Sequence, residues 1–286
     1  MAGGLVPSPV PAGEKLDREI ETVSDVEVSV ENLAGSVVVE AWDRDVVHIG
    51  GTIGDSADYL EVEVEPHEIE ISVDAGDGWN RWDTYEETDL KIRVPRNASV
   101  SVETVSARVS VEGVQGEVEV DTVSGMVRMT GGREAYLESV SGQISVEGVE
   151  GDISVESVSG LVAVEGCSGT GEIATTSGSI KVTRDCSFRD LEVESVSGLM
   201  DLDLTPLENG SYSIENLSGP IDVMLPEDLD AVIDVETFSG QVVSQFRGRS
   251  GEEEYGPGAW FRGEFGNGSA EIYIESFSGQ VHLNKR

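Results

Sequence analysis

Polar and apolar residues alternate along short stretches of this chain. Residues 143–147 read Gln-Ile-Ser-Val-Glu, and residues 152–156 read Asp-Ile-Ser-Val-Glu. Period-2 alternation with β-branched apolar residues predicts strands that have one buried and one exposed face. Paired glycines lie between the stretches, as in Gly148-Val149-Glu150-Gly151, and glycine favours turns. The pattern predicts short β-strands joined by glycine turns and indicates no helix.

A five-residue phrase recurs along the chain: an acid, Ser or Thr, an apolar residue, Ser and Gly. Its glycine falls at positions 125, 142, 160 and 178, in steps of 17, 18 and 18 residues. Later copies end at positions 198, 219, 240 and 279, and residues 103–107 repeat the phrase with Ala in place of Gly. The last step, 39 residues, is close to two periods. Self-similarity at a fixed period indicates a stacked array.

We expect an all-β fold, a parallel β-solenoid with coils of 18 to 21 residues, each made of two short strands and two turns. A single coil cannot bury its Val and Ile face, whereas coils stacked about 4.8 Å apart bury a continuous column. In this arrangement Val146 points inward and Gln143 outward. The competing geometry is an up-and-down meander of hairpins. It is less favoured, because identical phrases stack in register only when every second strand runs parallel.

The repeat predicts one solenoid domain over residues 14–286. Residues 14–98 form an irregular N-terminal part, 99–240 the regular coils and 241–286 a closing part. Two aromatic-bearing segments, 74–87 and 247–268, interrupt the repeat near the ends. Unpaired strand edges need covers, so these irregular segments are candidate caps. We expect residues 1–13 to be a disordered Pro-rich linker, left where a leader was removed or replaced, and a native cytosolic N-terminus is the alternative.

The acidity of the chain disfavours negatively charged partners. Its 286 residues carry 56 acidic and 18 basic side chains, for a formal net charge of −38. Phosphates would be repelled, which excludes nucleic acid and disfavours anionic membrane surfaces. No apolar run approaches the roughly 20 residues of a membrane span.

Several stretches resemble a known family. They are Glu-Asn-Leu-Ala-Gly at 31–35, Val-Glu-Ala-Trp-Asp at 39–43, Val-Pro at 94–95, the serial Ser-Gly phrases and Ser-Phe-Ser-Gly-Gln-Val at 276–281. Over roughly residues 14–286 the chain resembles the bacterial β-strand-repeat family labelled "putative adhesin". The resemblance implies an exported solenoid of unknown function, with no known catalytic residues. The chain departs from the pattern at Ala107 and at residues 176–178, where no acid precedes Ser-Gly.

Catalytic motifs are not evident in the sequence. The three histidines, His48, His67 and His282, are scattered and lack metal-ligand spacing. The phrase serines, from Ser124 to Ser278, are interpreted as turn residues that bond backbone amides. The periodic acids are interpreted as a solvated face.

Only the segments that break the repeat gather aromatic, basic and acidic residues. Aromatic rings with flanking polar groups can stack on a sugar, although capping of the core ends is the favoured interpretation. The candidate ligand-binding residues are Trp79, Arg81, Trp82, Tyr85, Tyr255 and Trp260, with Phe261 and Arg262 nearby.

Aspartates of the first segment could supply oxygen ligands to Ca²⁺, the one cofactor considered. They are Asp74, Asp77 and Asp83, with Asp89 close by, and their spacing fits no EF-hand loop.

The two cysteines, Cys167 and Cys186, are predicted to form a disulfide. Aligning Val164 with Val182 places Cys167 opposite Asp185 or Cys186 on the next coil. Stacked strands bring Cα atoms to about 5 Å, which is within the bridging range. Two free thiols are the alternative.

The acid of the repeated phrase is expected to form a stacked column, so that stability depends on salt or divalent cations. Its members are Glu103, Asp121, Glu138, Glu156, Glu194, Glu215 and Glu236.

We expect a non-enzymatic cell-envelope protein, structural or adhesin-like, periplasmic or extracellular if a leader is absent from this chain. Its partner would be a cell-surface glycan or an envelope protein. One alternative is an envelope polysaccharide-acting enzyme on a β-helix scaffold. Another is a self-assembling solenoid with uncovered ends.

Overall fold

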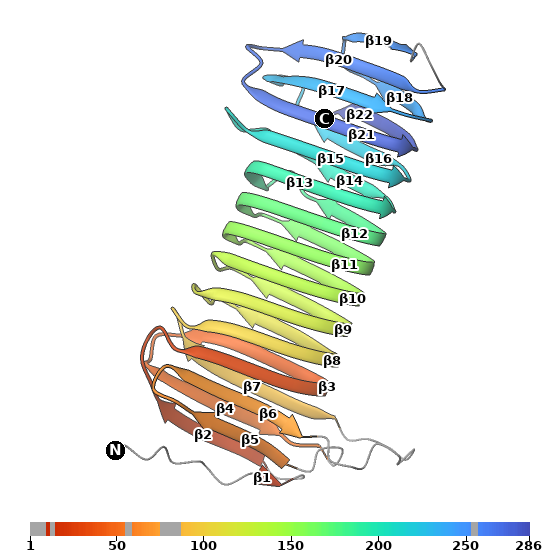
Figure 1. Cartoon of the computed structure of the whole chain (residues 1–286). Helices are drawn as coiled ribbons and strands as arrows, with labels where there is room; N and C mark the ends of the chain where they lie inside the picture. Colours follow the sequence, from red (N-terminus) through yellow and green to blue (C-terminus); the bar gives the residue numbers. More distant parts are fainter. Residues whose placement is uncertain (1–9, 12–14, 55–58, 75–86, 253–256) are drawn as a thin grey trace, which may run out of the picture. The chain divides into compact units, whose positions relative to one another are not determined.

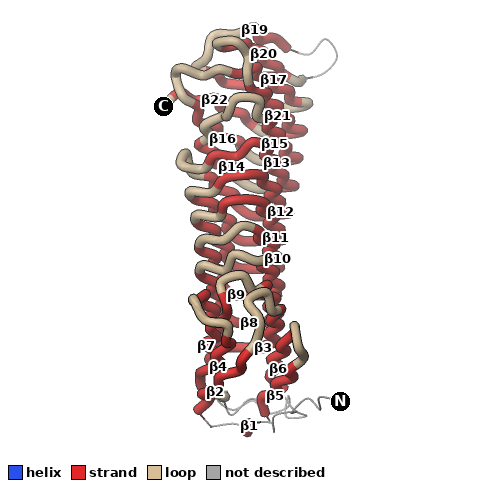
Figure 2. The backbone as a smooth tube through the Cα atoms, turned by 90° about the vertical axis from the view of Figure 1, so that its left-hand side faces the viewer, coloured by secondary structure: helices blue, strands red, loops and turns tan. Residues whose placement is uncertain are grey.

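The computed structural model describes residues 10–11, 15–54, 59–74, 87–252 and 257–286. Every regular element in this part of the chain is a β-strand (Figures 1 and 2), as the all-β prediction required. No helix in it could cross a bilayer. The chain divides into two compact units, residues 1–141 and 142–286, which we describe one at a time. The expectation of a single domain stays a prediction.

The described residues of unit 1 form nine strands and most of a tenth. They are β1 (Val10–Pro11), β2 (Lys15–Glu21), β3 (Glu27–Trp42), β4 (Val46–Thr52), β5 (Tyr59–Val64), β6 (Glu68–Asp74), β7 (Thr88–Pro95), β8 (Ser99–Glu112), β9 (Glu117–Thr130) and β10 (Glu134–Glu147), which runs past the boundary at residue 141.

The long strand β3 joins the regular coils of unit 1 to its irregular part. On one side β3 pairs in parallel with β8 along nearly its whole length, and β8 pairs with β9. On the other side its first half pairs with β6 and its second half with β7. The antiparallel strands β5 and β1 extend the β6 row, and β4 and β2 extend the β7 row.

Unit 2 begins within β10, and the part of it that the structure describes forms twelve further strands. They are β11 (Glu150–Glu165), β12 (Ser168–Val182), β13 (Ser187–Ser197), β14 (Met200–Asp203), β15 (Ser211–Ser218), β16 (Ile221–Leu225), β17 (Ala231–Thr237), β18 (Gln241–Ser244), β19 (Arg249–Glu252), β20 (Ala259–Phe265), β21 (Ala270–Ser278) and β22 (Gln280–Lys285).

Successive coils of unit 2 stack in parallel and in register, which confirms the solenoid. β11 pairs with β12, with Gly160 opposite Gly178 and Val164 opposite Val182, as the repeat predicted. β12 pairs with β13 and β14, and these pair with β15 and β16. Val146 is fully buried and Gln143 is exposed, as expected.

In β10, β11 and β12 the Ser-Gly position is a bend inside one strand, which corrects our division of these coils, whereas at Gly198, Gly219, Gly240 and Gly279 it separates two strands, as expected. β11 continues through Gly160 for 16 residues. Gly160 has φ +128°, and a Cβ on it would lie 1.7 Å from the carbonyl oxygen of Gly142 on the preceding coil. The backbones therefore touch at this corner, and only glycine fits.

The last coil is inserted out of sequence order, which corrects the reading of the 39-residue step as two periods. β21 pairs in parallel with β15 on one side and with β17 on the other. In Figure 1 the strand β21 accordingly lies between β15 and β17. β22 lies in the same way between β16 and β18. The antiparallel strands β20 and β19 then follow β17, consistent with the predicted capping of this end.

The core of unit 2 is a set of stacked apolar columns with a polar column at the corner. Val155, Ile173 and Val193 form one fully buried apolar run. The second residue of the phrase is also buried in each coil, and these residues are Ser157, Thr175, Ser195, Asn216, Ser276 and Thr237. The later serine of the phrase bonds carbonyl oxygens of the preceding coil, not amides: Ser177 Oγ donates to Val158 O at 3.3 Å.

Candidate functional site

Three neighbouring strands of unit 2 present aromatic and charged side chains on the outward side of their sheet. β17 pairs with β20 and β21 so that Asp234 lies between Arg262 and Tyr273, and Glu236 between Trp260 and Glu275. Side chains alternate between the two faces of a strand, and the core takes the intervening residues. The C-terminal face is defined as Asp234, Glu236, Trp260, Arg262, Tyr273 and Glu275.

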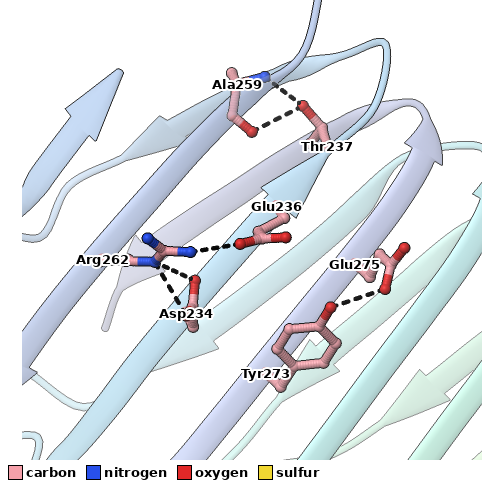
Figure 3. Close-up of polar contacts among 7 residues, drawn as sticks. All are labelled: Asp234, Glu236, Thr237, Ala259, Arg262, Tyr273 and Glu275. Carbon is pink, nitrogen blue, oxygen red and sulfur yellow. Dashed lines mark hydrogen bonds and ion pairs between the residues drawn. The ribbon is translucent and has the colours of Figure 1, made fainter. Parts of the chain in front are cut away.

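Arg262 links the two carboxylates of β17. Its Nε lies 3.0 and 3.1 Å from the two carboxylate oxygens of Asp234, and its Nη2 lies 2.5 Å from Glu236 Oε1 (Figure 3). These hydrogen bonds raise the pKa of Arg262 above its usual value. The guanidinium carbon also lies 5.6 Å from the centre of the Trp260 ring. The arrangement holds a cation beside an indole ring on a partly exposed surface.

Tyr273 is fixed by the carboxylate two residues further along its strand. Its hydroxyl donates to Glu275 Oε2 at 2.8 Å, and this bond, burial and the charge of Glu275 raise the pKa of Tyr273 to about 12. Figure 3 shows the Tyr273 and Glu275 side chains beside each other, on the strand next to Asp234 and Glu236. The phenol therefore remains a hydrogen-bond donor at neutral pH, with its ring about one-third exposed.

A row of exposed apolar side chains runs along the corner of unit 2. It consists of the third residue of each phrase, which alternation turns outward, and Thr176 interrupts it. Phe277 and Phe238 are half or more exposed, and their rings stack at 4.7 Å with an interplanar angle of 8°. The corner ridge is defined as Val158, Val196, Leu217, Phe277 and Phe238. Unit 1 has the same feature at Leu33, Val105, Val123 and Val140.

Unit 1 contains a cleft of about 430 Å³ at the corner of β3, β5, β6 and β8. Its lining combines carboxylates with apolar side chains: Glu31, Glu61, Glu103, Leu33, Val73 and Val105. The Ser72 hydroxyl donates to Glu31 Oε2 at 3.1 Å.

The candidate residues from the sequence are only partly placed. Trp260, Phe261 and Arg262 lie on β20, where Phe261 is buried and the other two belong to the C-terminal face. Asp74 ends β6, and Asp89 on β7 accepts a hydrogen bond from Ser36. The remaining candidates lie outside the described residues; they are Trp79, Arg81, Trp82, Tyr85, Tyr255, Asp77 and Asp83.

Metal binding stays a prediction. In the part of the chain that the structure describes, no three His, Cys, Asp or Glu side chains are arranged to hold a metal ion. Two of the three aspartates considered for Ca²⁺ fall outside that part.

The cysteines lie side by side in the core of unit 2 as two thiols. Cys167 is fully buried and Cys186 nearly so, and the Cys167 backbone N–H donates to Cys186 Sγ at 3.4 Å. A hydrogen bond between the thiols lowers the pKa of Cys186 to about 7 and raises that of Cys167. The disulfide remains a prediction, and the two cysteines lie side by side, as it requires.

Sequence reasoning missed Tyr273, Glu275 and the stacked Phe238 and Phe277. The signal was present in the alternation, because an inward Ser places the next apolar residue outward. Interpretation of the phrase as a turn assigns its apolar residue to neither face of a strand. The proximity of Phe277 to Phe238 also depends on the insertion of β21, which spacing does not indicate.

One solved structure from bacteria shares the fold, and two others match this chain along nearly its whole length. A protein of Parabacteroides merdae described as a putative adhesin is 9% identical, with 96% of this chain and 98% of that chain covered and a TM-score of 0.51. A putative adhesin of Bacteroides fragilis is 12% identical over 96% and 98% of the two chains, with a TM-score of 0.42. A putative lipid binding protein of Parabacteroides distasonis is 14% identical over 96% and 97%, with a TM-score of 0.48. At such identities the likeness concerns the fold alone.

None of the curated proteins matches the chain. A protein-family profile, described as Toastrack DUF4097, matches residues 23–284. That match covers most of the 286 residues and agrees with the resemblance found in the repeated phrases. The chain belongs to the Toastrack DUF4097 family.

Proposed function

We propose that this protein is a non-enzymatic recognition protein of the bacterial cell envelope, which binds carbohydrate on its C-terminal face. The observation that carries the proposal is the grouping of Trp260, Tyr273, Arg262 and four carboxylate oxygens from Asp234 and Glu236 on one exposed sheet surface.

The chemistry of this surface suits a sugar. The apolar faces of sugar rings stack on aromatic side chains whose polar ends stay wet. Carboxylates and a guanidinium offer acceptors and donors for hydroxyl groups, and charge-assisted hydrogen bonds are stronger than neutral ones. Because these groups stand on paired strands, their positions are set by the sheet and need little ordering on binding.

The fold supports the same class of function. The Parabacteroides merdae protein with this fold is described as a putative adhesin. An exported, surface-binding role for this chain agrees with that description. Its strong acidity, with a net charge of −38, also favours an uncharged or cationic partner over an anionic one.

A glycan array probed with the full chain tests the proposal. We expect binding to a defined set of envelope-type glycans and a loss of at least tenfold in affinity for Tyr273→Ala and Trp260→Ala. Glu264→Gln, on the same strand as Trp260, is the matched control and should bind like the wild type. Since Trp260 is partly buried, circular dichroism must show that its variant is folded, and Tyr273→Phe supplies a milder second test. Unchanged binding by both alanine variants would refute the assignment.

A pair of opposed carboxylates on the C-terminal face is the observation that favours the enzyme alternative. Glu236 and Glu275 are opposite each other on adjacent strands, as a pair of catalytic carboxylates would be. In the structure Arg262 bonds the first and Tyr273 the second. Incubating each bound glycan with the chain and measuring new reducing ends or unsaturated products decides the point, because a binding protein releases neither.

A further inference from the structure

The corner ridge is bordered by a column of carboxylates. Glu156, Glu194 and Glu215 each stand two residues before a ridge residue, on the same outward face of the strand. Ala174 takes this position on β12, between Glu156 and Glu194. Two residues along a strand span about 6.6 Å. Glu194 is opposite Glu215, which is opposite Glu275. An apolar stripe and an acidic stripe therefore run side by side across the stacked strands.

This ridge is not needed to close the core. Val158 and Val196 are each 48% exposed and Leu217 is 51% exposed, whereas the inward residues of the same strands are buried. A row of exposed apolar side chains on every coil from β11 to β17 except β12 is unusual on a protein surface and marks an interaction site. The acidic stripe excludes a second copy of the same surface, because like charges would face each other.

We propose that the corner ridge and its acidic border bind a basic amphipathic α-helix of a partner protein. The apolar side of such a helix covers the ridge, and its lysines or arginines reach the carboxylates of the border. The border continues into Glu275 and Glu236 of the C-terminal face, but the inference does not depend on carbohydrate binding.

The spacing favours a helix over an extended peptide. Ridge residues on adjacent coils are about 4.8 Å apart, and a helix laid along the ridge presents an apolar residue about every 5.4 Å, one per turn. An extended strand presents same-face residues about every 6.8 Å, which differs more from the spacing of the ridge residues. From β11 to β17 the ridge crosses five steps, or roughly 24 Å, which matches a helix of about 16 residues.

The negative charges of the border favour a positively charged partner. Glu215 and Glu236 both contribute to the raised pKa of Tyr273, so the negative field extends along the column. A helix with lysine or arginine beside its apolar stripe complements this surface, and such helix-on-surface recognition uses apolar anchors at i, i+3, i+4 and i+7. Electrostatic complementarity of this kind speeds association and makes it sensitive to salt.

The test uses the full chain and a fluorescent 16-residue peptide of leucine and lysine, with leucine at i, i+3, i+4 and i+7. One control peptide has the same composition in scrambled order, and another has glutamate in place of lysine. Fluorescence anisotropy at 50 and 500 mM NaCl gives the Kd values, and circular dichroism follows helix formation. We expect the patterned peptide to bind at least tenfold more tightly than either control.

Three matched variants locate the site. Val158→Thr with Val196→Thr and Leu217→Gln should weaken binding at least tenfold. Glu156→Gln with Glu194→Gln and Glu215→Gln should remove most of the salt dependence. Met224→Gln with Val243→Thr removes two exposed apolar side chains from β16 and β18, which carry no ridge residue, and should change nothing.

Three results would overturn the proposal. The scrambled peptide could bind within twofold of the patterned one, which would reduce the effect to charge alone. The ridge variant could bind like the Met224 and Val243 control. Sedimentation of the chain alone, or its binding to phosphatidylcholine vesicles, could depend on the ridge, which would make the occupant a second copy or a lipid surface.

Discussion

The corner glycine shows at the scale of one residue why the phrase ends as it does. At Gly160 a Cβ would meet the Gly142 carbonyl oxygen, and at Gly178 a Cβ would lie 2.3 Å from that of Gly160. The same contact recurs from coil to coil. The glycine therefore allows adjacent coils to stack closely. The ridge residue two positions before it is held in a fixed position as a result.

Gly160→Ala should destabilise unit 2 strongly, because it combines positive-φ strain with a backbone clash. We expect a loss of about 2–4 kcal/mol in the free energy of unfolding. Gly148→Ala is the control, since Gly148 has φ +67° but no atom within 4 Å of its Cβ position. It should cost about 1 kcal/mol. Urea denaturation measures both, and equal losses would show that the contact is relieved by a shift of the coils.

The cysteine pair makes the second prediction at this scale. Oxidation of Cys167 and Cys186, which are 19 residues apart, would close a loop worth about 3 kcal/mol of stability. Thiol titration of unfolded, unreduced protein from an oxidising compartment should find no free thiol. Reductant should lower the melting temperature of the wild type and leave that of Cys167→Ser unchanged. Two thiols per chain would contradict the disulfide.

At the scale of the strand, the sequence predicts which residues of two paired strands are opposite each other, but it does not predict which strands are neighbours. The pairing of Val164 with Val182 followed from spacing, because apolar and polar positions must match on adjacent coils. The insertion of β21 between β15 and β17 could not be predicted from spacing. Both β17 and β21 carry the same phrase, and either strand fits beside β15 in the same register. The C-terminal face depends on that insertion, so sequence indicated Trp260 and Arg262 but not Tyr273.

Opposed carboxylates on β5 and β6 of unit 1 give a pH prediction. Glu63 is opposite Glu70, and burial together with Glu63 and Glu31 raises the pKa of Glu70. A raised folded-state pKa means that its contribution to stability is present in acid and is lost as the pH rises through the folded pKa.

Glu70→Gln should therefore raise the melting temperature at pH 7, and the gain should vanish below about pH 4, where the wild-type residue is protonated. Glu119→Gln serves as the control, because Glu119 is exposed and is opposite Ser101. A gain from Glu70→Gln that is the same at pH 4 and pH 7 would mean that its ionisation is not the cause.

At the scale of the molecule, both units follow one plan: an apolar core of stacked columns, a buried polar column at the corner and exposed acids and apolar residues outside. Their end strands differ from this plan. β2 is rich in charged residues and β19 has only four residues, and both features discourage pairing with another chain. They weigh against the self-assembling alternative.

The stacked acids predict a dependence on salt. Two unit charges about 5 Å apart repel by roughly 0.8 kcal/mol at the dielectric constant of water, and 1 M salt shortens the Debye length to about 3 Å. The melting temperature should rise between 10 mM and 1 M NaCl. Glu194→Gln with Glu215→Gln should raise it in low salt only. A flat profile, unaffected by these changes, would show that the side chains splay apart without cost.

The central claim is that the outward corner of unit 2 is free for recognition because the core does not need it. The melting temperature of the variant with Val158→Thr, Val196→Thr and Leu217→Gln tests this most directly. Exposed substitutions cost at most about 0.5 kcal/mol each, so the account predicts a shift of no more than about 6 °C. The single change Val155→Thr, in the fully buried column of β11, should cost more. A ridge variant that melts lower than Val155→Thr would contradict the account, since the ridge would then be part of what holds the coils together.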